Sequence, residues 1–206
     1  MEIKSKKELK FVITADKIMN GSGGGVKRLL FPNYIEKFLI EMRKVSFYKH
    51  QGGFLSKFFF VLHYAKYRKL GMMLGFSIGC DTLGYGVKIP HYGTIVIGES
   101  NRIGNYAVLH TSTCISDNGK IIGDGLYLST GAKITSKIKL GNNISIGANS
   151  LVNKDCEQDN VLLGGMPAKV IRQEEPWYVR DSKGMEGRSY YQKVQYIEEM
   201  KKKFGL

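Results

Sequence analysis

Aliphatic residues recur at every sixth position through the middle of the chain. The series runs from Ile97 to Ile121 and, after a shift of one residue, continues from Ile122 to Val152. Glycine often follows the aliphatic residue, and the fifth position of each hexad is often small or aliphatic. Neither the 3.6-residue turn of a helix nor the two-residue alternation of a hairpin gives this pattern. It indicates a coil of short parallel strands in which the first and fifth positions point inward.

Helical patterns flank the repeats. Residues 34–45 and 54–73 place apolar side chains three to four positions apart, and SYYQKVQYIEEMKKKF at 189–204 predicts a final helix. The stretch GGMPAKVIRQ at 164–173 reads as an exit loop after the last coil. NGSGGGVK at 20–27 lacks the ending of a phosphate-binding loop, so we expect a flexible loop there.

The patterns together predict a mainly β protein. We expect an N-terminal helical domain at 1–74, a parallel β-helix of hexapeptide repeats at 75–172, and a tail with a helix at 173–206. The helical domain would cover the open end of the β-helix, where strand edges are otherwise unpaired.

Composition favours a cytoplasmic protein. The first twenty residues are charged throughout, and the longest apolar run, FFFVL, is far shorter than the roughly 20 residues of a membrane span. The three cysteines are widely spaced without a CxxC pair, which predicts free thiols rather than a disulfide framework or a zinc site.

The net charge of +13 is concentrated at the N-terminus. Residues 1–74 carry 15 Lys and Arg against 5 Asp and Glu, whereas residues 75–168 carry 7 of each. The chain has no nucleic-acid-binding motif, so we expect no nucleic-acid partner. A peripheral contact with an anionic membrane, at its inner face, is the favoured interpretation.

The four histidines are the first candidates for acid–base chemistry. His50 and His63 fall in the helical segments, where structural roles are expected. His91 takes the inward slot of the hexad before Ile97, and His110 takes a corner slot where glycine is usual. Both choices cost folding stability, which is typical of functional sites.

Several ordered motifs resemble the serine acetyltransferases, a family of hexapeptide-repeat acyltransferases. IPHYGTIVIGE is similar to that family's His-x-x-Gly segment, and STGAKI, SIGANSLV and GGMPAKVI are similar to its acetyl-CoA-binding coils and exit loop. The resemblance spans roughly residues 74–172. It implies a left-handed β-helix with three hexads per coil, acetyl-CoA as cosubstrate, no metal, and a homotrimer with the CoA groove between subunits. It also implies a catalytic base at His91, pantetheine contacts from backbone groups, and a lysine near the CoA phosphates; the cofactor-binding residues would be Ser129, Thr130, Gly147, Ala148 and Lys169.

The departures from the family pattern concern the acceptor. Pro90 stands where the family has an aspartate before the catalytic histidine, and CISDNGKIIGDG lacks the family's Arg-His pair. The upstream aspartate that orients the histidine falls near Ser77, with Asp81 as a substitute. The remaining pattern, with HYGTIVI, a histidine at position 110 and a PAK ending, resembles the O-acetyltransferases of capsule and lipopolysaccharide clusters. The expected acceptor is therefore a sugar hydroxyl, with serine as the alternative.

Direct transfer is the expected mechanism. His91 would take the proton of the acceptor hydroxyl, and a backbone N–H at a coil corner would stabilise the oxyanion. His110 either orients the acceptor or holds a corner. Three alternatives stay open: a covalent step at Cys114, a γ-type carbonic anhydrase, which would need a third histidine on zinc, and a non-enzymatic scaffold.

Overall fold

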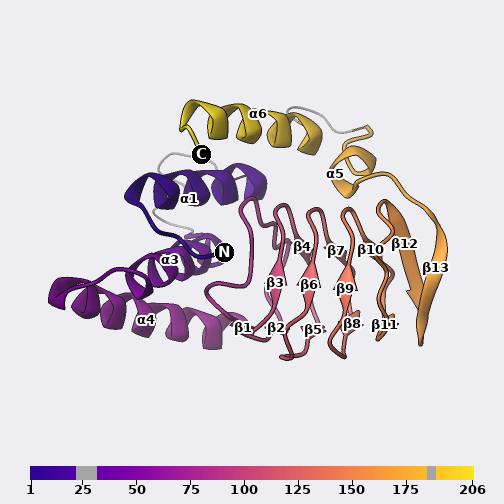
Figure 1. The fold of residues 1–206 in the computed structure, drawn as a ribbon, viewed down its shortest axis with the longest axis horizontal. Helices are drawn as coiled ribbons and strands as arrows, with labels where there is room; N and C mark the ends of the chain where they lie inside the picture. Colours follow the sequence, from indigo (N-terminus) through magenta and orange to yellow (C-terminus); the bar gives the residue numbers. More distant parts are fainter. Residues whose placement is uncertain (22–31, 185–188) are drawn as a thin grey trace.

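The computed structural model describes residues 1–21, 32–184 and 189–206, so most of the NGSGGGVK stretch lies outside the described residues. Figure 1 shows a row of coils with helices packed at one end and along one side. The helices are α1 (Lys6–Asn20), α3 (Tyr34–Lys49), α4 (Phe54–Leu74), α5 (Trp177–Arg180) and α6 (Tyr190–Lys203).

The coils build a parallel solenoid with three faces, each a separate sheet. The first sheet has the order β1 (Phe76–Ile78), β2 (Ile95–Ile97), β5 (Thr113–Ile115), β8 (Lys133–Ile134) and β11 (Leu151–Val152). The second has β4 (Val108–Leu109), β7 (Tyr127–Leu128), β10 (Ser145–Ile146), β12 (Val161–Gly165) and β13 (Ala168–Gln173). The third has β3 (Arg102–Ile103), β6 (Ile121–Ile122) and β9 (Lys139–Leu140).

Aliphatic ladders form the core of the solenoid, as the hexads predicted. Ile97, Ile115, Ile134 and Val152 are paired in register from coil to coil, and all four are buried. Each such side chain contributes about 1.5–3 kcal/mol by leaving water. The corners need small residues: a Cβ on Gly98 would lie 2.2 Å from the Cβ of Asp117 in the next coil.

The helical segment caps the first coil. Arg43 of α3 is fully buried and donates to both carboxylate oxygens of Asp16 in α1, at 2.8 and 3.3 Å. The same guanidinium donates to the carbonyl oxygens of Leu83 and Gly84, at 2.8 and 2.5 Å. These bonds tie both helices to the backbone at the open end of the solenoid.

The C-terminal tail folds back along the second sheet. Trp177 of α5 is buried, and its Nε1–H donates to the carbonyl oxygen of Tyr106 at 2.8 Å. Ile197 of α6 is buried in the same cluster as Phe11 of α1. The tail therefore covers the outer face of the second sheet, and α6 packs against the helical cap.

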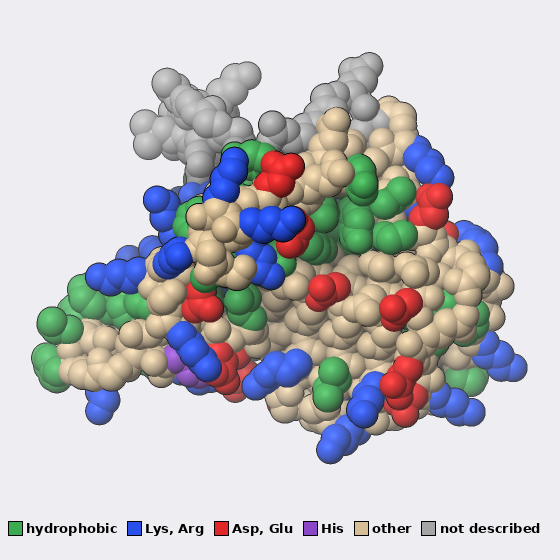
Figure 2. Space-filling model, turned by 45° about the horizontal axis from the view of Figure 1, so that its top comes forward, with side chains coloured by type: hydrophobic (Ala, Val, Ile, Leu, Met, Phe, Trp, Pro, Cys, Tyr) green, Lys and Arg blue, Asp and Glu red, His purple; other side chains and the backbone are tan. Residues whose placement is uncertain are grey.

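The fold prediction is confirmed: a parallel β-helix of five coils follows N-terminal helices and precedes a tail helix. One local prediction is wrong. Residues 164–173 do not form a plain loop, because most of them belong to the antiparallel pair β12 and β13. None of the described helices is long and apolar enough to cross a membrane. Figure 2 shows exposed hydrophobic side chains at the end of the molecule where Figure 1 places α4.

Candidate active site

The corner between the second and first sheets gathers most of the predicted site residues. Leu109, Leu128 and Ile146 are paired in register, so the residues that follow them, His110, Ser129 and Gly147, stack from coil to coil. We call these three residues, together with the residue that follows each of them in the chain, the corner row. The corner row consists of His110, Thr111, Ser129, Thr130, Gly147 and Ala148.

Lys169 lies at the far end of the corner row. Ile146 pairs with Leu163, which extends the stack to Gly164, and Gly164 pairs with Lys169 across the β12–β13 hairpin. Lys169 is exposed. Histidine and lysine thus stand at opposite ends of one continuous row.

Several backbone N–H groups of the corner row have no acceptor among the described residues. Alternate amides in this corner donate to a neighbouring coil. Gly131 N donates to the carbonyl oxygen of Thr111 at 3.1 Å, and Asn149 N donates to the carbonyl oxygen of Thr130 at 3.0 Å. The amides of Thr130 and Ala148 have no acceptor among the described residues, and both residues are exposed. A ligand lying along the row could accept hydrogen bonds from these amides.

The predicted inward position of His91 is wrong. His91 is exposed, and the inward position belongs to Ile89, which is buried. The cause is a longer corner: seven positions separate Lys88 from Ile95, but five separate their partners Val108 and Thr113. The two additional residues carry His91 out of the core onto the surface of the corner, beside the first member of the corner row.

His110 is half-buried and has a defined partner. Its Nε2 lies 3.0 Å from the hydroxyl of Tyr127, which stands on the neighbouring strand β7. Burial lowers the pKa of His110, and the charges of His91 and Lys88 lower it further, while the charge of Asp181 acts in the opposite direction. The pairings of Lys88 with Val108 and of Ile95 with Thr113 place the corner that holds His91 beside the corner that holds His110. His110 is therefore held neutral over a wider pH range than a free histidine.

The C-terminal tail contributes Arg180 and Glu174 to the end of the site that contains His110 and Tyr127. The guanidinium of Arg180 lies over the Tyr127 ring, 4.7 Å from its centroid, and donates to the hydroxyl of Ser145 at 3.2 Å. Glu174 pairs with Arg180 at 3.2 Å. The sequence carried no periodic signal for Tyr127 or Arg180, because their meeting depends on how the tail docks.

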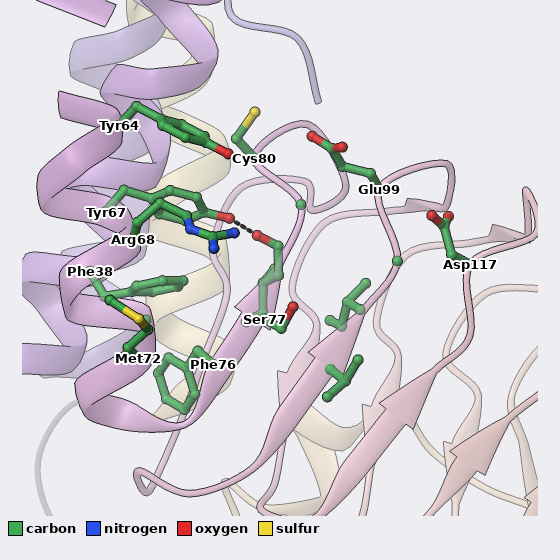
Figure 3. A pocket seen from close by; sticks show the side chains of 16 residues that line it. Phe38, Tyr64, Tyr67, Arg68, Met72, Phe76, Ser77, Cys80, Glu99 and Asp117 are labelled. Atoms are coloured by element: carbon green, nitrogen blue, oxygen red, sulfur yellow. Dashed lines mark hydrogen bonds between the residues drawn. The ribbon is translucent and has the colours of Figure 1, made fainter. Parts of the chain in front are cut away.

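The two predicted orienting residues lie elsewhere. Asp81 is buried, and its carboxylate binds Ser46, Lys49 and His50 at 2.6, 3.0 and 3.1 Å, so it ties α3 to the first coil. Ser77 faces outward from β1 into a cavity of about 380 Å³ beneath α4. Figure 3 shows this cavity with Glu99 and Asp117 on its far side. Among the described residues, no hydrogen bond links Ser77 or Asp81 to His91.

Cys114 lies on the outer face of the first sheet, between Val96 and Lys133, and not on the corner row. Its position does not favour a covalent step. Within the described ranges, no group of three or more His, Cys, Asp or Glu side chains could hold a metal ion.

Comparison with known proteins points to one class of enzyme. Over 96 residues the chain is 32% identical to a serine acetyltransferase of Synechococcus elongatus, a match covering 43% of this chain and 39% of the relative. A serine acetyltransferase of Mycobacterium tuberculosis is 31% identical over 101 residues, covering 46% and 44%. The chain thus spans less than half the length of these curated relatives. No family model matches it.

Solved structures show the same fold. A serine acetyltransferase of Neisseria gonorrhoeae superposes with a TM-score of 0.60 at 23% identity, covering 83% of this chain and 69% of the other. Soybean serine acetyltransferase gives 0.63 at 20% identity, covering 79% and 69%. A serine acetyltransferase in complex with CoA gives 0.60 at 19% identity, covering 79% and 67%.

The comparisons correct the predicted acceptor. These relatives and structures are serine acetyltransferases, which contradicts the sugar hydroxyl and supports the alternative that the sequence left open. The narrower resemblance to capsule and lipopolysaccharide enzymes has no support among them. The proline at position 90, where the family has an aspartate, and the missing Arg-His pair are therefore not evidence for a sugar acceptor.

Proposed function

We propose that the chain is an acetyl-CoA-dependent serine O-acetyltransferase. The observation that carries the proposal is the corner row, which has His110 and the adjoining corner of His91 at one end, free amides at Thr130 and Ala148, and Lys169 beyond its other end. The names of the similar proteins supply the substrate class.

The corner row suits the CoA part of the cosubstrate. The amides of Thr130 and Ala148 would donate to the carbonyl groups of the pantetheine arm, while Ser129 and Gly147 form the floor between them. The exposed ammonium of Lys169 would lie toward the phosphates. With the phosphates toward Lys169, the thioester would lie at the opposite end of the corner row, beside His110.

The histidine end would carry out the transfer. His91 takes the proton from the hydroxyl of L-serine, and the oxygen attacks the thioester carbonyl carbon while the oxyanion accepts a hydrogen bond from a corner amide. The carbon–sulfur bond then breaks, and the proton on His91 passes to the leaving sulfur. The products are O-acetylserine and the free thiol of CoA. Neutral His110, held by Tyr127, would orient the acceptor.

Assembly and location complete the proposal. A homotrimer would place the corner row of one subunit against its neighbour and exclude water from the thioester. The cytoplasm remains the expected compartment.

Product identification tests the proposal. The purified chain is incubated with acetyl-CoA and L-serine, and the products are identified by mass spectrometry, with L-alanine as a control acceptor that lacks only the hydroxyl. We expect O-acetylserine with L-serine and no acetylated product with L-alanine. Absence of O-acetylserine from a folded, CoA-binding protein would refute the assignment.

A further inference from the structure

The first turns of α4 form an exposed apolar surface. Phe54 is 83% exposed, Leu55 70% and Phe58 59%, and Val61 and Leu62 of the next turn are exposed as well. We call these five residues the α4 tip. Monomeric soluble proteins rarely expose so many large apolar side chains together, and such patches mark interaction sites.

The α4 tip is exposed because its side chains face away from α3, whereas Phe59, whose ring stacks on Tyr48 of α3 at 5.4 Å, lies on the covered face of the helix. The His63 ring stacks on Tyr48 of α3 at 5.3 Å, and its Nδ1 lies 2.5 Å from Glu41. Tyr67 stacks on Phe38 at 5.2 Å. The tip lies at the end of α4 farthest from β1, where Figure 1 shows the helix reaching away from the coils and Figure 2 shows hydrophobic side chains at the surface.

The charges around the α4 tip have one sign. Helix α4 contains Lys57, Lys66, Arg68 and Lys69 and no acidic residue. The two acidic residues of the adjoining α3 are already engaged, because Glu36 is buried against Lys17, and Glu41 binds Lys44 as well as His63. A second copy of the same surface would bring like charges together, whereas anionic headgroups would balance them.

We propose that the α4 tip docks on an anionic membrane surface. Phe54, Leu55 and Phe58 enter the boundary between headgroups and acyl chains, while Lys57, Lys66 and Lys69 contact the headgroups. The helix does not span the bilayer. This inference goes beyond the proposed acetyl transfer and does not depend on it.

Vesicle flotation of the full chain tests the inference. One set of vesicles contains phosphatidylcholine and phosphatidylglycerol in equal parts, and the other contains phosphatidylcholine alone. The test variant is the double substitution Phe54→Ser with Phe58→Ser. The matched control is Ile121→Ser, which removes a 56% exposed apolar side chain from the third sheet.

We expect binding to the anionic vesicles that weakens as salt is raised, and a loss of about tenfold or more in the double variant but not in the control. Far-UV circular dichroism checks that both variants are folded. Equal binding by the double variant and the wild type, or equal binding to both vesicle types, would overturn the inference. Self-association of the wild type that the double variant abolishes, without vesicle binding, would identify a second copy as the partner instead.

Discussion

The hydroxyl of Tyr127 lies 3.0 Å from Nε2 of His110, and the two rings are 5.1 Å apart between centroids. Tyr127 precedes the inward Leu128 and faces the tail, so a residue of the solenoid links the corner row to Arg180. The arrangement fixes the His110 ring in one orientation. Its consequences can be measured.

Replacing Tyr127 with Phe removes this hydrogen bond and keeps the ring that Arg180 covers. We expect kcat to fall by about fivefold, since a neutral hydrogen bond contributes about 1 kcal/mol, while KM for acetyl-CoA changes little. Steady-state kinetics with both substrates measures the two effects. A rise in KM for acetyl-CoA at constant kcat would place Tyr127 in cosubstrate binding instead.

The coupling between the two histidines predicts a pKa change. A positive charge on His91 disfavours a second charge on His110, so the substitution His91→Gln should raise the pKa of His110 toward 6.5 without reaching it, because burial still lowers it. NMR titration of the imidazole resonances gives the value. The substitution His50→Gln, at the distant Asp81 network, is the control. A pKa of His110 that stays constant or falls in His91→Gln would contradict this arrangement.

The corner row can be blocked without disturbing the core. Ala148 is exposed, so Ala148→Trp should leave the free energy of unfolding unchanged and raise KM for acetyl-CoA on the order of tenfold by filling the proposed groove. Lys137→Trp, at an exposed position of another corner, is the matched control. Unchanged CoA affinity in Ala148→Trp would move the cosubstrate away from this row.

The stability of the helical cap should depend on the buried ion pair of Arg43. Arg43→Ala leaves the buried Asp16 carboxylate without its ion-pair partner and removes the bonds to Leu83 and Gly84, so we expect a loss of about 3–5 kcal/mol in the free energy of unfolding. Lys44→Ala on the same helix breaks a partly exposed pair and should cost about 0–1 kcal/mol. Chemical denaturation measures both variants. Similar losses would mean that the buried pair is not what holds the cap.

The hexad period was sufficient to predict the solenoid, because inward positions such as Ile115 and Ile134 must stack for the coils to bury a core. The residues of the corner row came from the resemblance to serine acetyltransferases, and the period explains why they stack, since equivalent positions of successive hexads align. It misplaced His91 because a period fitted from Ile97 onward does not reveal two additional residues in the preceding corner.

Contacts distant in sequence could not be predicted in this way. Asp81 was expected beside the histidine, but α3 engages it through Ser46, more than thirty positions earlier. The apolar composition of α4 predicted a helix without showing that Phe54 and Phe58 face solvent while Phe59 packs on Tyr48 of α3. The acceptor was mispredicted because missing residues were read as evidence for another substrate.

The measurement that most directly tests the proposed transfer, with His91 as its base, compares turnover with CoA binding in His91→Ala. His91 is exposed, so its removal should leave the fold intact. We predict that serine-dependent thiol release from acetyl-CoA is lost, by at least about a hundredfold, while calorimetry shows CoA binding within about twofold of the wild type. Thiol release at the wild-type rate by the folded variant would show that His91 is not the base and that the reaction, if it occurs, takes place elsewhere.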